Sequence, residues 1–199
     1  MVANRLFSIV ISGWPAVGKT TIAYKLAEEF GIAMYNGGDI LKMLAEEDKG
    51  YSVKRDDWWD TIEAKKFMEE RNLNPSFDKK VDDKLIQIVK KGGAVITSYT
   101  LPWLVVDEPV IIIKFWLRGS PENRAKRMAN RDGISFAEAE RITKLRDEEN
   151  KRIYHRLYGF RFGEDLTVFD YVLNTDRLSL DSLVEISKLI VRRHIGVPP

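Results

Sequence analysis

Short runs of apolar residues alternate along the chain with longer stretches in which apolar positions recur every three or four residues. The runs predict buried strands at 7–11, 33–35, 94–98, 110–117 and 170–174. The longer stretches predict helices at 21–30, around 56–71, and at 77–91, 121–130, 136–157 and 180–193, with a short helix opening near residue 39. Strands that alternate with helices predict an α/β fold, a doubly wound parallel sheet of about five strands with helices on both faces.

The segment between the first strand and the first helix reads Gly13-Trp14-Pro15-Ala16-Val17-Gly18-Lys19-Thr20, which matches the phosphate-binding loop pattern G-x-x-x-x-G-K-[ST]. Its glycines let backbone N–H groups turn toward an anion, and the following helix adds its positive end. We expect Lys19 to reach the β- and γ-phosphates and the Thr20 hydroxyl to bind the metal. The residues expected to hold the nucleotide are Gly13, Pro15, Ala16, Val17, Gly18, Lys19, Thr20 and Thr21. The expected cofactors are ATP and Mg²⁺.

Composition narrows the class of protein. A chain of 199 residues fits a single domain, and the absence of cysteine excludes disulfides and thiolate metal sites and suits a reducing cytoplasm. The first apolar run is a strand rather than a signal peptide, and no run is long enough to span a bilayer. We therefore expect a cytoplasmic protein without a membrane partner. Monomer and homodimer both stay open.

Positive charge concentrates at 114–161, where thirteen Lys and Arg face seven Asp and Glu. Nucleic acid and nucleotide polyphosphate are both possible partners for such a segment, and the phosphate loop favours the nucleotide. Arg124, Arg127 and Arg131 are spaced i, i+3 and i+7, which puts them on one helix face. They can grip phosphate oxygens, although flanking acidic residues also allow a solvated face. Arg146 is expected to make a second phosphate contact.

The chain resembles the archaeal type of cytidylate kinase, a branch of the P-loop nucleoside monophosphate kinases. The residues that carry the resemblance are Ile11-Ser12-Gly13, Gly18-Lys19-Thr20-Thr21, Gly38-Asp39-Ile40, Trp103, Arg124-Ala125-Lys126-Arg127, Arg131-Asp132-Gly133, Tyr154, Tyr158-Gly159 and Asn174-Thr175. The resemblance implies a single kinase domain with a core at 1–36, 92–119 and 165–195, an acceptor-binding region at about 37–91 and a mobile lid at about 120–135. It also implies that the three lid arginines close over the ATP phosphates, Arg127 and Arg131 acting in catalysis, and that Asn174 and Thr175 lie near the adenine.

The chain departs from this family where the acceptor monophosphate is bound. Lys42 stands where an arginine is usual, and Thr97-Ser98-Tyr99 replaces an acidic-Gly-Arg signature. The arginine that usually precedes the tyrosine matched by Tyr154 is Ile153, with Arg152 one place earlier, and Glu149 replaces a serine. Two hypotheses follow: a cytidylate kinase with relocated contacts, or a kinase of another small metabolite. The acceptor contacts expected from the sequence are Asp39, Lys42, Trp58, Tyr99, Trp103, Arg146 and Arg152.

Some of these residues have a second interpretation. Asp39 could act as a general base toward a hydroxyl acceptor, cap the helix that starts at Ile40, or do both. Trp58 and its neighbour Trp59 could line the acceptor pocket or simply pack. His155 and His194 are expected at the surface.

A different class of protein, a nucleotide-binding regulator or an ATPase without an acceptor, also stays open. The string 104–108, Leu-Val-Val-Asp-Glu, looks like a Walker B motif, but Pro109 follows it and favours a surface connection. The second metal anchor is then Asp39, Asp107 or water alone. A GTPase is disfavoured because the chain has no Asn-Lys-x-Asp motif.

Overall fold

A computed structural model describes residues 6–50, 66, 69–70, 74, 76–106 and 109–196. Trp58, Trp59, Asp107 and nearly all of the helix expected at 56–71 lie outside the described residues. The flanks of the Walker-B-like string are described, and they are not a strand: Leu104 ends a short helix and the next strand begins at Ile111.

The sheet has five parallel strands, as predicted, and their order is β2-β3-β1-β4-β5. Their bounds are Phe7–Gly13 (β1), Ala33–Asn36 (β2), Ala94–Thr97 (β3), Ile111–Arg118 (β4) and Tyr171–Asn174 (β5). β1 lies between β3 on one side and β4 on the other, so the strand order reverses direction there. In open α/β sheets ligands bind in the crevice at the carboxyl ends of the strands beside such a reversal.

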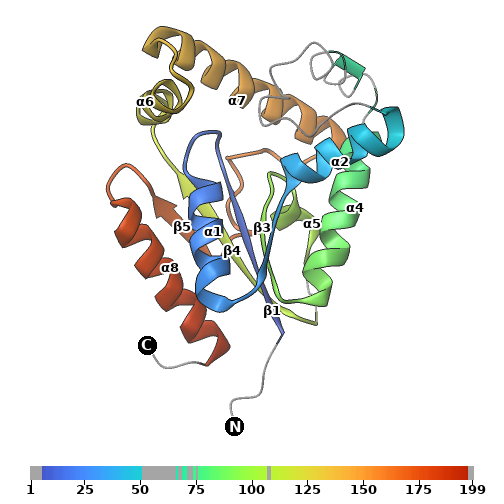
Figure 1. Cartoon of the computed structure of the whole chain (residues 1–199), viewed down its shortest axis with the longest axis vertical. Helices are drawn as coiled ribbons and strands as arrows, with labels where there is room; N and C mark the ends of the chain where they lie inside the picture. The colour runs from blue at the N-terminus through green and yellow to red at the C-terminus, as the bar shows by residue number, and fades with distance from the viewer. Residues whose placement is uncertain are drawn as a thin grey trace.

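Alternate residues of the central strands enter two separate cores. Ile9 and Ile11 pack with α1 (Lys19–Phe30) and α8 (Leu180–Ile195) on one face of the sheet. Val10 packs on the other face with α2 (Gly37–Lys49), α4 (Ser76–Lys91) and α5 (Leu101–Leu104). Figure 1 shows these helices on the two sides of the sheet, which confirms the doubly wound architecture.

A helical hairpin lies across the carboxyl end of the sheet (Figure 1). It consists of α6 (Pro121–Asp132) and α7 (Phe136–Tyr158). Ser120 and Ser135 cap their amino ends, since each side-chain hydroxyl accepts a hydrogen bond from the amide three residues later. The hairpin contains the segment expected to form the lid. Its boundaries as a moving unit stay a prediction.

A cluster of aromatic residues joins α7, β4 and the loop after α7. Fully buried Phe162 lies at its centre, against Trp14, Tyr99 and Trp116. Among the helices of the described residues, none combines the length and apolar character that crossing a bilayer demands.

Candidate active site

The phosphate loop follows β1 and has the backbone that its sequence predicts. Gly13 has φ +145°, and a Cβ there would lie 2.3 Å from the carbonyl oxygen of Leu117 in β4, so no other residue fits. Gly18 caps α1 with φ 90°, and Ala16 is held in the left-handed region at φ 61°. Because glycine has no side chain to cap a helix, the first amides of α1 are left to bind an anion.

Lys19 lies over this loop. Its ammonium donates to the carbonyl oxygens of Gly13 (2.8 Å) and Trp14 (2.7 Å) and lies 4.7 Å from the centre of the Tyr99 ring. Burial of the ammonium, and next the nearby Arg124 charge, lower the pKa of Lys19 to about 7, while Asp147 acts in the opposite direction. Part of the Lys19 side chain still reaches solvent. A phosphate bound at the loop would place a negative charge near the Lys19 amine and so favour its protonated form.

Thr20 and Thr21 form the first turn of α1, and both are exposed. The exposed Thr20 hydroxyl beside the loop fits one ligand of Mg²⁺, an ion that commonly keeps waters and phosphate oxygens as its other ligands. Within the described part of the chain no three His, Asp or Glu side chains gather to hold a metal. The roles of Thr20 as a metal ligand and of Asp39 as a second anchor stay predictions.

Arg127 joins the hairpin to the segment after β5. Its guanidinium donates to the Thr175 hydroxyl (2.8 Å) and the Thr175 carbonyl (2.5 Å). Thr175 is 3% exposed and also bonds the backbone of Arg118 at the end of β4. Two residues expected at the nucleotide, one from the lid and one from the adenine segment, are thus in direct contact. Asn174 accepts a hydrogen bond from the amide of Asp176 in the same turn.

Arg124 has a different environment from the other two arginines. Its side chain is 3% exposed and forms two hydrogen bonds with Asp147 of α7, at 2.9 and 2.6 Å. The guanidinium also lies 3.5 Å from the carbonyl oxygen of Pro15 and 5.6 Å from the centre of the Trp14 ring. Arg124 therefore joins α6 to α7 beside the phosphate loop. Its contact with ATP stays a prediction, and the side chain would have to make that contact in addition to its pair with Asp147.

Arg131 is the exposed member of the row. It pairs with the adjacent Asp132 at 2.6 and 2.8 Å, which raises the pKa of Arg131, and Tyr99 adds to this effect. Arg146 of α7 lies near the same aspartate, since its charge helps to lower the pKa of Asp132. Arg131 and Arg146 are thus two exposed cations of the hairpin above the sheet.

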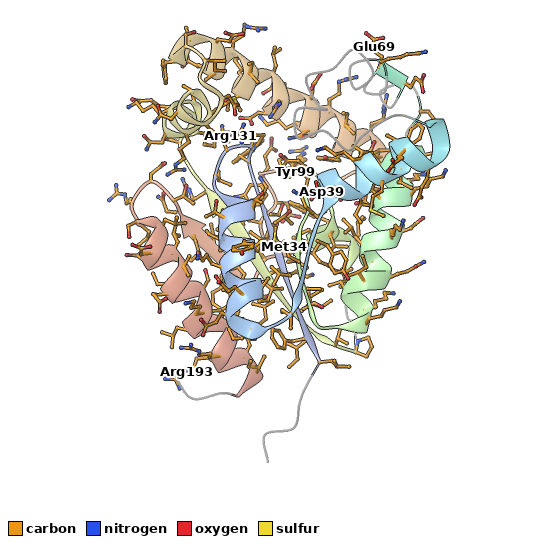
Figure 2. The ribbon with its side chains drawn as sticks, viewed as in Figure 1. Met34, Asp39, Glu69, Tyr99, Arg131 and Arg193 are labelled. Carbon is orange, nitrogen blue, oxygen red and sulfur yellow. The ribbon has the colours of Figure 1, made fainter. Side chains whose placement is uncertain are left out.

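Tyr99 lies beside Lys19, and Asp39 lies at the same end of the sheet. Figure 2 shows both at the carboxyl end of the sheet, below Arg131 and the hairpin. Asp39 is exposed in the first turn of α2, and Lys42 follows on the same helix. The interpretation of Asp39 as the helix cap is wrong, because Asn36 takes that position and its side chain accepts from the Gly38 amide at 2.9 Å.

Two other expected acceptor contacts lie elsewhere. Trp103 belongs to the aromatic cluster, stacked on Phe160 with ring centres 4.4 Å apart. Arg152 lines a cavity formed by α7 and the loop after it, together with His155. Exposed His155 and His194 agree with the surface positions predicted for them, although His194 also bonds the Tyr171 hydroxyl.

Sequence reasoning missed the residues that brace this site. Asp147, the partner of Arg124, was not among the residues predicted for the site. Asp82 of α4, 4% exposed, accepts from Thr100 and from Tyr158 (2.5 Å), so it joins the turn that carries Tyr99 to the end of α7. Burial and this aspartate raise the pKa of Tyr158. Asp82 shares the buried face of α4 with Phe77, Val81 and Leu85 and with a second aspartate, Asp78, so aspartates at apolar positions of the helical pattern were the available signal.

Known proteins resemble this chain over most of its length. The model of the cytidylate kinase-like family matches residues 8–177. A cytidylate kinase of Pyrobaculum aerophilum is 36% identical over 179 residues, which cover 90% of this chain and 89% of that protein. One from Sulfurisphaera tokodaii is 37% identical over 183 residues and 92% of both chains, and one from Pyrococcus horikoshii is 32% identical over 92% of this chain and 87% of its own length.

Solved structures agree on the fold. An uncharacterized protein from Eubacterium ventriosum has a TM-score of 0.62 at 19% identity and covers 96% of this chain and 99% of its own. A shikimate kinase from Bacteroides thetaiotaomicron has a TM-score of 0.56 at 17% identity with the same coverage. At such identities the likeness concerns the fold alone. The match over residues 8–177 and the relatives above 30% identity place this chain in the cytidylate kinase-like family.

Proposed function

We propose that the protein is an ATP- and Mg²⁺-dependent nucleoside monophosphate kinase whose acceptor is CMP or dCMP. The observation that carries the proposal is the Lys19 ammonium, held at the phosphate loop between two backbone carbonyls and the Tyr99 ring. Exposed Asp39 and Tyr99 occupy the same end of the sheet on the acceptor side. Membership of the cytidylate kinase-like family supports the choice of acceptor.

Each side chain then has a role in phosphoryl transfer. The amides of residues 13–20 and Lys19 bind the β- and γ-phosphates and orient the γ-phosphoryl group toward the acceptor. Arg131 and Arg146 extend from the hairpin toward the transferred group, and Arg127 positions the hairpin against Thr175. Mg²⁺, held by Thr20 with phosphate oxygens and water, would neutralise charge on the phosphates. The aromatic cluster excludes water from one side of the site.

The test is ADP release from ATP and Mg²⁺ with a panel of nucleoside monophosphates, nucleosides and small alcohols. We expect CMP or dCMP to stimulate release well above the other compounds. Lys19→Ala should abolish that stimulation, whereas Lys25→Ala, on the exposed side of the same helix, should retain it. Release that is independent of every acceptor would instead indicate an ATPase.

A second candidate acceptor is a hydroxyl-bearing metabolite without a phosphate. It is favoured by Tyr99, whose uncharged ring lies beside Lys19 and packs on Tyr154 and Phe162. A tyrosine can donate one hydrogen bond but cannot neutralise a dianion. Under this candidate Asp39 is the general base, and alcohols rather than monophosphates should stimulate ADP release.

A further inference from the structure

A second cavity lies on the hairpin, apart from the phosphate loop. It has a volume of about 450 Å³ and is formed by the C-terminal half of α7 and the loop that follows it. Its lining residues are Glu148, Lys151, Arg152, His155, Arg161, Phe162 and Glu164. The phosphate loop, α2 and the turn after β3 contribute no lining residue, so it is distinct from the site described above.

The cavity carries an excess of positive charge. Glu148 pairs with Lys151 at 3.4 Å, and Glu164 with Arg161 at 3.8 Å. The side chains of Arg152 and His155 make no hydrogen bond or ion pair with another described residue. A planar guanidinium with free donors beside further cations is suited to phosphate oxygens, which it can bind in a bidentate manner.

The wall of the cavity is continuous with the phosphate loop. Phe162 packs edge-on against Trp14 with ring centres 5.0 Å apart. The ammonium of Lys151 lies 5.6 Å from the centre of the same Trp14 ring. Next to Phe162, a Cβ on Gly163 would lie 2.1 Å from the Trp14 ring. The backbone of Gly163 therefore packs tightly against Trp14, without room for a side chain. A ligand in the cavity would thus be separated from Lys19 and the amides of the phosphate loop by the Phe162 and Trp14 rings.

We propose that this cavity is a binding site for a small polyphosphate anion, separate from the catalytic site. The volume is in the range of pockets that hold nucleotide-sized ligands. Arg152 and Arg161 hold the phosphate groups, and Lys151 adds its charge where the cavity meets Trp14. This site explains part of the positive charge at 114–161 that the catalytic site does not use.

Calorimetric titration with inorganic pyrophosphate tests the site. We expect the wild-type protein to bind two equivalents, one at the phosphate loop and one in the cavity. Arg152→Glu/Arg161→Glu should weaken one of the two by at least tenfold, whereas Lys19→Ala should weaken the other. Lys91→Glu/Arg193→Glu, which carries the same charge change on exposed residues at the ends of α4 and α8, should retain both (Figure 2 labels Arg193).

A single equivalent that is lost in Lys19→Ala would overturn the proposal, and so would two equivalents that survive Arg152→Glu/Arg161→Glu. Weak binding that never saturates would mean diffuse attraction to the basic surface and would overturn it as well. Thermal melting of each variant checks that it is folded. The stoichiometry does not depend on turnover, so a failed kinase assay leaves this test intact.

Discussion

The pair between Arg124 and Asp147 leads to a quantitative prediction about stability. Arg124 is 3% exposed and Asp147 is 15% exposed, and two hydrogen bonds join them. Asp147→Asn removes the carboxylate charge and leaves the guanidinium buried without a counter-charge in contact. Such a change typically costs about 3–5 kcal/mol. Arg124→Met leaves a carboxylate that retains some contact with water and lies near Lys19, so we expect a smaller loss of about 1–3 kcal/mol.

The double variant separates the charge pair from simple packing. Arg124→Met/Asp147→Asn combines the same two substitutions and leaves no buried charge, so its cost should fall below the sum of the single costs by about 1–3 kcal/mol. Urea unfolding at a fixed pH measures all three, with unchanged slopes required for the comparison. Lys126→Met is the matched control, since Lys126 on the same helix is 56% exposed in its pair with Glu122 and should cost under about 1 kcal/mol. A cost below about 1 kcal/mol for Asp147→Asn, or additive single costs, would refute the reasoning.

Three further predictions concern the catalytic site and its support. The pKa of Lys19 is about 7 in the folded ligand-free protein and 10.5 in the unfolded chain. Between these pH values the folded protein binds fewer protons than the unfolded chain. Its free energy of unfolding should therefore rise with pH across this range. By the same shift ATP binding near pH 8.5 should take up close to one proton, and a binding enthalpy that does not change with the ionisation enthalpy of the buffer would contradict this. Gly163→Ala should cost at least about 2 kcal/mol in urea unfolding because its Cβ meets Trp14, more than Gly196→Ala, where the space is open; equal costs would exclude the steric explanation. Arg127→Ala should reduce kcat at least about 100-fold, more than it changes the KM for ATP, because the hairpin loses its contact with Thr175 and the reacting groups are misplaced. An unchanged kcat would show that this contact does not position the hairpin for transfer.

The sequence alone determined the architecture and the phosphate loop. β-branched apolar runs and helical periodicity are local patterns, and they were sufficient for five strands and for the helices of the described residues other than α5, a single turn that was not predicted. Gly13, Gly18 and Lys19 are recognised by their spacing in the sequence. The spacing is fixed because a loop between a strand and a helix has few conformations that direct its amides to an anion. The starts of α6 and α7 are fixed by an equally local contact, the serine cap at each amino end.

Only the tertiary structure decided which charges meet. Arg124, Arg127 and Arg131 look equivalent along one helix, yet one is buried against Asp147, one bonds Thr175 and one pairs at the surface. Arg152 falls in a separate cavity. Arg124 and Arg127 bind partners 23 and 48 residues away along the chain. Which partner each arginine meets depends on the orientation that α6 and α7 take when their apolar sides pack. That orientation depends on shape complementarity between distant segments, which no local pattern encodes.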